Sequence, residues 1–308
     1  MTTSPAQPTP PLLHNRYRIT NRLGENRLAV VYQAQDERLG RRVLVHVLRP
    51  QLQENEQLKR RFGEEAQAQA RRNHPALLEL FDSGEVGGRP YMITEDVEGR
   101  PLAEALPLPL PRAVQVWRQI VGGVATTIST NTPTPPITSK TILLTDAGRP
   151  VLTESWWLDA DALRLELAHY RAPERTLGSP PDERNLVYSL GILGYELLGG
   201  IRPFSGTDAA QVQNLHVQRS LPPAMELAPG FTPSLAAALA MATARDPQAR
   251  TATVQALARD LAGVESVAEA PTRQMLQPVK LRESVREAIK PITQRRAPPP
   301  PSPTMAPS

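Results

Sequence analysis

Short runs of apolar residues alternate with polar residues through the first hundred positions, in the pattern typical of β-strands. Such runs begin near Arg16 and recur at Val43–Leu48, Leu77–Phe81 and Tyr91–Val97. Between the second and third runs, residues 54–72 carry apolar side chains at helical spacing along one side. The pattern therefore predicts a β-rich first region that contains one helix.

The rest of the chain shows mainly the spacing of helices. Apolar residues recur three and four positions apart along one buried face, which comprises Val114, Trp117, Ile120, Val124 and Ile128. Residues 188–200 are apolar nearly all round, which is typical of a central helix buried on every side. Between these helices, the short apolar runs 142–145 and 151–153 are joined by an Asp-x-Gly turn, which predicts a β-hairpin. Trp117 is expected in the core rather than in a site.

Several segments carry motifs in a fixed order. Residues 24–31 read Gly-Glu-Asn-Arg-Leu-Ala-Val-Val, residues 171–175 contain Ala-Pro-Glu, and Arg202-Pro203-Phe204 follows the apolar helix. Residues 246–250, Asp-Pro-Gln-Ala-Arg, precede the last predicted helix. Together these motifs resemble the bacterial, eukaryotic-like Ser/Thr protein kinase family over residues 16–261.

The resemblance implies an α+β fold with two lobes, as in protein kinases. A small β-rich N-lobe with one helix is expected at residues 15–95, and a larger, mostly helical C-lobe at residues 96–266. The resemblance also implies a buried ion pair between Glu174 and Arg250 that braces the C-lobe.

The same resemblance implies a nucleotide cleft between the lobes, although its motif is altered. His46 stands where the family has the lysine that pairs with the phosphates and with a helix glutamate. Asn26 and Ala29 replace two glycines of the phosphate-binding loop. A mostly neutral imidazole cannot replace a long, permanent cation. The vestigial cleft is expected at Gly24, Val31, Leu44, His46, Glu65, Thr94, Glu95, Val97 and Leu143.

The residues that carry phosphoryl transfer in the family are replaced here. Pro136 stands at the position of the catalytic Asp, Thr141 at that of the metal-binding Asn, and Glu154 at that of the metal-binding Asp. Proline can neither accept a proton nor hold a metal, and transfer depends on charge neutralisation by Mg²⁺. We therefore predict no catalytic residue, no metal site and no cofactor. Because Glu154 keeps a carboxylate, weak ATP or Mg²⁺ binding is an alternative.

Composition narrows the functional classes further. The chain has no cysteine, which excludes disulfides and thiolate metal sites and fits a cytoplasmic location. No apolar run approaches the ~20 residues of a membrane span. The net charge of +4 lies entirely within residues 267–308, so the neutral remainder gives no reason to expect nucleic-acid binding.

Both ends of the chain are expected to be largely disordered. Residues 1–14 are rich in Pro, Thr and Ser, and the basic tail at 267–308 ends in a Pro-rich stretch. Apolar residues of the tail recur at helical spacing beside basic ones, at Leu281, Val285, Ile289 and Ile292. This pattern indicates a helix that either lies on the C-lobe or contacts a partner or an anionic membrane surface.

The favoured hypothesis is a catalytically inactive kinase domain, a pseudokinase, that acts as a signalling scaffold. The expected partner is an active kinase or a phosphothreonine-binding domain, docking at threonines and serines beside prolines: Thr132, Thr134, Ser302 and Thr304. One alternative is a degenerate Ser/Thr kinase with residual ATP binding or transfer. A second is a membrane-surface or nucleic-acid adaptor that uses the basic tail.

Overall fold

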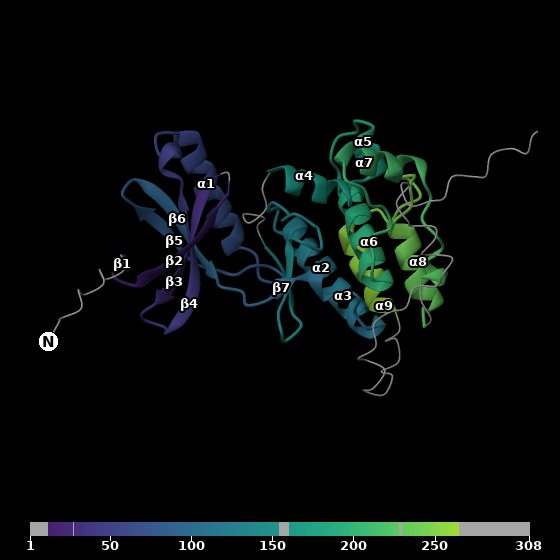
Figure 1. Ribbon diagram of the computed structural model, residues 1–308, viewed down its shortest axis with the longest axis horizontal. Coiled ribbons are helices and arrows are strands. Elements are labelled where there is room, and N and C mark those ends of the chain that lie inside the picture. Colours follow the sequence, from purple (N-terminus) through teal and green to yellow (C-terminus); the bar gives the residue numbers. More distant parts are fainter. Residues whose placement is uncertain (1–11, 27, 154–159, 228–229, 265–308) are drawn as a thin grey trace, which may run out of the picture.

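The computed structural model describes residues 12–26, 28–153, 160–227 and 230–264. Figure 1 shows two lobes, one a β-sheet with a single long helix and the other mostly helical. The α+β class and the bilobal arrangement that the resemblance implied are confirmed. The expectations for residues 1–11 and for the tail at 267–308 fall outside the described residues.

The N-lobe sheet has six strands in the order β1-β2-β3-β4-β6-β5, and all neighbours are antiparallel. Apolar side chains leave both faces of β4, so the sheet has a cluster of buried residues on each side. The strands are β1 (Leu12–Leu13), β2 (Tyr17–Glu25), β3 (Ala29–Asp36), β4 (Arg41–Leu48), β5 (Leu80–Val86) and β6 (Arg89–Glu95).

One face of this sheet is covered by α1 (Glu56–Ala70), which follows the 3₁₀ turn η1 (Pro50–Leu52). Asn55 caps the helix, because its side-chain oxygen accepts a hydrogen bond from the Leu58 amide at 3.0 Å. The cap explains why α1 starts two residues later than the apolar spacing predicted. Phe62 packs between the helix and the sheet.

Two predictions for the N-lobe are wrong in detail. Disorder does not extend through residue 14, because Leu12 and Leu13 form β1 against β2. Leu13 is buried in the apolar cluster that also contains Tyr17 and Val45. The strand expected at Leu77–Phe81 begins only at Leu80. Leu77 instead makes an isolated parallel bridge to Leu152 of the C-lobe.

The C-lobe is built around α3 (Leu110–Ser129) and α6 (Glu183–Gly199). Helix α6 begins with a capping box in which Asp182 and Asn185 exchange side-chain-to-backbone hydrogen bonds. It is buried on nearly every side, as its apolar sequence predicted. The other helical elements are α2 (Leu102–Ala105), α4 (Ala160–Ala168), α5 (Pro173–Thr176), α7 (Ala209–Gln218), η2 (Ala224–Glu226), α8 (Pro233–Ala242) and α9 (Val254–Gly263).

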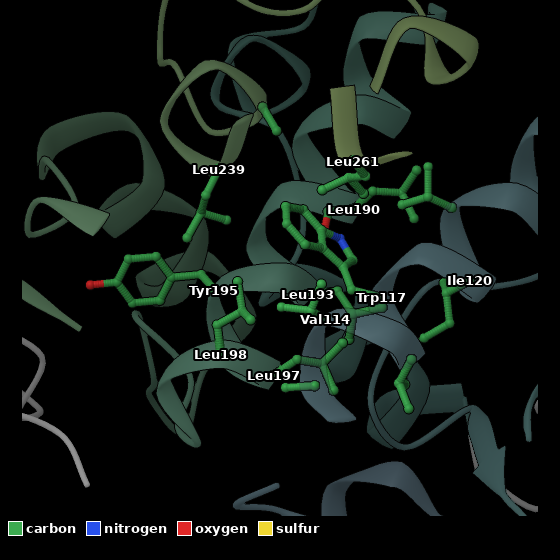
Figure 2. Packing of buried hydrophobic residues seen from close by; sticks show 14 of the residues in the cluster. Val114, Trp117, Ile120, Leu190, Leu193, Tyr195, Leu197, Leu198, Leu239 and Leu261 are labelled. Atoms are coloured by element: carbon green, nitrogen blue, oxygen red, sulfur yellow. The ribbon is translucent and has the colours of Figure 1, made fainter. Parts of the chain in front are cut away.

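Trp117 of α3 lies at the centre of this packing, surrounded by leucines of α6 and α9 (Figure 2). It is fully buried, and its indole Nε1 donates a hydrogen bond to the Leu190 carbonyl oxygen at 2.9 Å. The ring lies against Gly194, where an added Cβ would overlap its six-membered ring. Glycine in the middle of α6 therefore allows the two helices to approach closely.

A small sheet lies where the lobes meet, in the order β7-β8-β9. Its strands are β7 (Arg100–Pro101), β8 (Ile142–Leu144) and β9 (Pro150–Leu152), so the predicted hairpin is present. Gly148 in its turn has a φ of +74°, a backbone conformation that favours glycine. The hairpin places Leu143 and Thr153 beside the segment that joins the lobes.

Glu174 and Arg250 lie in contact in the C-lobe. The guanidinium binds the carboxylate through two hydrogen bonds of 2.6 and 3.0 Å, and Asn185 donates a third at 2.6 Å. Arg250 also stacks over the Tyr188 ring, 4.8 Å from its centroid. Burial acts to raise the pKa of Glu174, but the hydrogen bonds that its carboxylate accepts and the charge of Arg250 together outweigh burial and hold the pKa below its ordinary value.

Among the helices that the structure describes, none combines the length and the apolar character needed to cross a membrane.

Candidate functional site

A cleft of about 320 Å³ opens between the lobes, with side chains from both on its walls. Most of the lining is apolar. Leu44 forms part of its wall, as expected from the sequence. The lining residues are Leu23, Leu44, His46, Leu78, Glu95, Asp96, Val97, Pro101, Leu143 and Thr153.

His46 sits on β4 opposite Met92 of β6 and is only 1% exposed. Its Nε2 lies 2.9 Å from the Thr94 hydroxyl oxygen, and its Nδ1 has no hydrogen-bond partner within the part of the chain that the structure describes. Burial lowers the pKa of His46 to about 4, so the ring is neutral at pH 7. Position 46 therefore supplies no positive charge to the cleft.

The turn between β2 and β3 is closed by Asn26. Its side-chain oxygen accepts hydrogen bonds from the amides of Leu28 at 2.8 Å and Ala29 at 2.7 Å. In the kinase family this turn offers its amides to nucleotide phosphates. Here two of those amides already have partners inside the protein, so they are not free for phosphate.

Glu65 of α1 does not line the cleft. Its carboxylate accepts a hydrogen bond from Arg72 at 3.2 Å, and Arg72 also donates to the Thr132 hydroxyl at 3.0 Å and the Pro133 carbonyl at 2.7 Å. Because the Arg72 side chain is only 6% exposed, this arginine ties α1 to the segment after α3. The helix glutamate thus pairs with an arginine of its own lobe rather than with position 46.

The loop that should carry the catalytic Asp is closed on itself. The Thr141 hydroxyl donates to the Pro136 carbonyl oxygen at 2.8 Å. The Thr141 amide donates to the Thr138 hydroxyl at 3.0 Å, and both threonines are fully buried. The positions of the family's base and metal ligand are therefore bonded to each other.

Glu154, which stands at the position of the family's metal-binding Asp, lies outside the described residues. Among residues 12–26, 28–153, 160–227 and 230–264, no group of three or more His, Asp or Glu side chains is arranged to hold a metal ion.

A buried ionic cluster fixes α4 against this loop. Glu166 of α4 is 3% exposed and pairs with Arg202 at 2.7 Å and Lys140 at 2.6 Å. Burial acts to raise the pKa of Glu166, but the hydrogen bonds from Arg202 and Lys140 outweigh it and hold the pKa below its ordinary value. Sequence reasoning missed this cluster, since its members belong to no single motif.

The cluster continues into α6 through Glu196. This carboxylate pairs with Arg202 at 3.2 Å and accepts hydrogen bonds from the Ser139 hydroxyl at 2.8 Å and from the Tyr170 hydroxyl. Two carboxylates thus share one arginine, with Lys140 as the second cation. The loop, α4 and α6 are held together by charge as well as by apolar packing.

Thr132 was expected as a phosphorylation site for docking, and its burial contradicts that role. It is 7% exposed, accepts a hydrogen bond from Arg72 and donates to the Thr127 carbonyl at 3.3 Å. Thr134 is half-buried and bonded to the Thr127 hydroxyl at 2.9 Å. Ser302 and Thr304 lie outside the described residues.

The structure brings five of the nine expected cleft residues to the wall: Leu44, His46, Glu95, Val97 and Leu143. The other four lie elsewhere: Gly24, Val31, Glu65 and Thr94. Thr94 contacts His46 through its hydroxyl group, and Val31 is buried on β3 directly opposite His46 of β4. The lining residues that the sequence missed are Leu23, Leu78, Asp96, Pro101 and Thr153. Asp96 lies between the expected cleft residues Glu95 and Val97, and Thr153 precedes Glu154. This proximity in sequence could have predicted both as lining residues.

The fold and the cleft define a protein-kinase-like domain. No family model matches the chain. Serine/threonine-protein kinase PknL of Mycobacterium tuberculosis is 33% identical over 270 residues, which cover 84% of this chain and 67% of PknL. Serine/threonine-protein kinase PrkC of Bacillus subtilis is 30% identical over 247 residues, 76% of this chain and 38% of PrkC. The chain belongs to the bacterial Ser/Thr protein kinase family.

Solved structures show the same fold. The crystal structure of the Mycobacterium tuberculosis PknI kinase domain superposes with a TM-score of 0.58 and 21% sequence identity. The match covers 83% of this chain and 99% of that domain. The match therefore spans nearly the whole of that kinase domain.

Proposed function

We propose that this chain is a pseudokinase, a kinase-like domain that binds protein partners and does not transfer phosphate. The observation that carries the proposal is the 2.8 Å hydrogen bond from the Thr141 hydroxyl to the Pro136 carbonyl oxygen. It joins the positions of the base and of one metal ligand inside the protein. A proline has no group that can take a proton from a substrate hydroxyl, and a buried, bonded threonine is a poor ligand for Mg²⁺.

Three contacts in the N-lobe support the same conclusion. The Asn26 side chain occupies two amides of the phosphate-binding turn. His46 is buried and neutral, and Glu65 is bound to Arg72. Phosphoryl transfer depends on positioning and on charge neutralisation. Each of these three features leaves fewer groups to position or neutralise a phosphate.

A binding role is supported by the parts of the domain that persist. The Glu174–Arg250 pair braces the C-lobe, and Glu166 holds α4 in a fixed place. A rigid C-lobe offers partners a defined surface at little cost in conformational entropy. We propose protein partners, such as an active kinase or a phosphothreonine-binding domain, with docking at Thr134, Ser302 or Thr304. We expect a cytoplasmic location, no cofactor and no nucleic-acid binding, with contact to an anionic membrane surface as a further role of the tail.

The proposal is tested by a transfer assay with radiolabelled ATP, Mg²⁺ or Mn²⁺ and a generic protein substrate. We expect no incorporation above the level of a heat-denatured sample. Incorporation that the Glu154→Ala variant abolishes would instead establish a degenerate kinase. Mapping phosphorylation in cells tests the docking role separately, because finding Thr134, Ser302 and Thr304 all unmodified would remove that role and leave scaffolding intact.

One observation favours residual nucleotide binding as a second candidate. The cleft keeps about 320 Å³ of space beside the backbone of Glu95 and Val97, the edge that contacts adenine in the family. A thermal melt with and without ATP and Mg²⁺ tests this candidate. A ligand that binds only the folded state raises stability by about 2.7 kcal/mol at a hundredfold excess over Kd. An unchanged melt at millimolar ATP would reject it.

A further inference from the structure

The C-lobe carries a further hollow, with a volume of about 230 Å³, that shares no lining residue with the interlobe cleft. Its walls come from α6, from the residues that join α7 to η2, from η2 itself, from α8 and from the turn that follows α8. Figure 2 shows the Tyr195 ring of α6 pointing away from Trp117, with Leu239 of α8 beside it. The lining residues are Tyr195, Ser220, Leu221, Pro222, Pro223, Ala224, Leu239, Ala240, Thr243 and Arg245.

Most of this wall is apolar. Two methionines that adjoin lining residues in the sequence are strongly exposed, Met225 of η2 at 45% and Met241 of α8 at 49%. A ligand with an apolar body would remove part of the wall from water, which is favourable roughly in proportion to the area buried. The volume is below the roughly 300–1,000 Å³ of sites for drug-sized molecules, so the ligand should be small. The aliphatic and proline residues of the wall are Leu221, Pro222, Pro223, Ala224, Leu239 and Ala240.

The charge of the hollow favours an anion. Arg245 is the one charged residue among the described residues that line it. Its Nη1 donates a hydrogen bond to the Val217 carbonyl oxygen at 3.2 Å, and no described carboxylate forms an ion pair with it. A guanidinium has five N–H donors and binds a planar carboxylate through two parallel hydrogen bonds, so Arg245 keeps donors for a ligand. The hydroxyl group of Ser220, which is also exposed, is a second donor of the wall.

A neighbouring carboxylate indicates how such a ligand would be oriented. Glu226 of η2 does not line the hollow, but it lies close to Tyr195. Burial raises the pKa of the Tyr195 hydroxyl, and the negative charge of Glu226 raises it further. A second negative charge would be repelled near Tyr195 and attracted by Arg245. The anionic group of a ligand is therefore expected beside Arg245, and its apolar part beside Tyr195.

We propose that this hollow binds a small organic anion, which places its carboxylate on Arg245 and its apolar body against Tyr195 and Leu239. The inference goes beyond the proposed function, because it assigns a ligand to a second site in the C-lobe. It does not depend on the loss of phosphoryl transfer, since the hollow and the interlobe cleft have no lining residue in common.

Three probes that share one apolar body separate charge from apolar contact: phenylbutanoate, phenylbutanol and phenylbutylammonium. We would titrate each probe into the full chain, labelled with ¹³C at the methionine methyl groups, and measure its affinity by NMR. We expect phenylbutanoate to bind at least about 3-fold more tightly than phenylbutanol, and phenylbutylammonium to bind most weakly. The signals of Met225 and Met241 should shift. The signal of Met92, which is buried in the N-lobe opposite His46, should not.

Two pairs of variants locate the site. Ala240→Leu adds volume at an exposed wall position of α8 and should weaken all three probes at least about 5-fold, whereas Ala237→Leu, exposed on α8 outside the hollow, should not. Arg245→Gln removes the charge, so phenylbutanoate and phenylbutanol should then bind equally. Arg259→Gln removes the same charge from an exposed position of α9 outside the hollow and should keep the wild-type preference.

Three results would overturn the inference: no binding by any probe, equal binding of all three probes to the wild-type chain, or a shift of Met92 while Met225 and Met241 stay unchanged. The last result would place the probes in the N-lobe. If a wall variant fails to fold, the probe preference and the methionine signals of the wild-type chain still decide. None of these results affects the pseudokinase proposal, which the transfer assay tests.

Discussion

The C-lobe brace and the interlobe cleft use polar residues in opposite ways. In the brace, Arg250 and Glu174 form a bidentate pair that Asn185 completes, and every charge meets its opposite. In the cleft, the His46 ring is neutral at pH 7, and its Nδ1 has no hydrogen-bond partner among the described residues. Both regions are buried, so burial alone does not separate them. They differ in whether removing one side chain leaves another, charged side chain buried without its partner.

This difference predicts how each of the two regions responds to substitution. A buried ion pair is costly to break, because the remaining partner keeps its charge in the protein interior, which solvates charges poorly. A buried neutral histidine can be replaced by an apolar residue at little cost, since no charge is stranded. The brace therefore constrains the sequence at two positions together, whereas position 46 should accept several uncharged residue types. The following substitutions test this contrast.

The largest effect is expected from Arg250→Ala. Removing the fully buried guanidinium leaves Glu174 charged and only partly bonded, which should lower the free energy of unfolding by about 3–5 kcal/mol. Urea denaturation at pH 7 measures the change. The double variant Arg250→Met with Glu174→Leu is the control, and it should recover most of the loss because no charge remains. If Arg250→Ala lowered the free energy of unfolding less than the double variant does, removing Arg250 would not leave a costly unpaired charge on Glu174.

Gly194→Ala tests the packing of the same lobe without charge. The new methyl group would overlap the Trp117 ring, so we expect a loss of about 1–3 kcal/mol despite the better helix propensity of alanine. Gly63→Ala in α1 is the matched control, since no atom lies within 4 Å of its Cβ position. It should gain about 0.5–1 kcal/mol. Thermal or urea unfolding of both variants measures the contrast. A change in stability of the same sign in both variants would refute the close approach of the Trp117 ring to Gly194.

Glu166→Gln addresses the buried ionic cluster of Glu166, Arg202 and Lys140. Loss of the charge beside Arg202 and Lys140 should lower stability by about 1–3 kcal/mol at pH 7. The pKa of Glu166 is depressed in the folded state, so its contribution is present above the unfolded value near pH 4.3 and is lost as pH falls through the folded pKa. The variant and the wild type should therefore converge in acid. Urea unfolding at about pH 7 and pH 3.5 measures this.

The local part of this architecture could be predicted from the sequence. The helical face around Trp117, the apolar helix α6 and the β8–β9 hairpin are visible because each depends on residues close together in the chain. The loss of charge at position 46 also followed from the residue type alone. The α+β fold and the kinase family were predicted from motif order and are confirmed.

The remainder depends on tertiary contacts that no local pattern contains. Glu166 meets Arg202 across 36 positions, and Arg72 meets Thr132 across 60. The sequence showed that Asn26 replaces a glycine of the phosphate-binding loop, but it did not predict the hydrogen bonds from the amides of Leu28 and Ala29 to the Asn26 side chain. The burial of Thr132, which overturned a docking prediction, has the same origin. Long-range polar contacts decide which motif residues remain available.

The smallest effect at neutral pH, and the sharpest test of the cleft, is expected from His46→Leu. The side chains are similar in size, and the change removes an acceptor without a partner, so stability at pH 7 should stay within about 1 kcal/mol of wild type. Loss of the hydrogen bond to Thr94 is offset because the threonine hydroxyl can still donate to the Glu95 carbonyl. A much larger loss would mean that position 46 is as constrained as the brace.

Acid separates the variant from the wild type. Burial depresses the pKa of His46 to about 4 in the folded chain, against roughly 6.5 when unfolded. Between these values the unfolded chain binds a proton that the folded chain does not, so wild-type stability falls as pH falls. Leucine removes this term, and the variant should exceed the wild type by about 2 kcal/mol at pH 5. Urea unfolding from pH 7 to 5 measures both slopes, with His46→Phe as a second non-titrating variant. Parallel slopes would mean that His46 takes up its proton in the folded chain and brings a positive charge to the cleft.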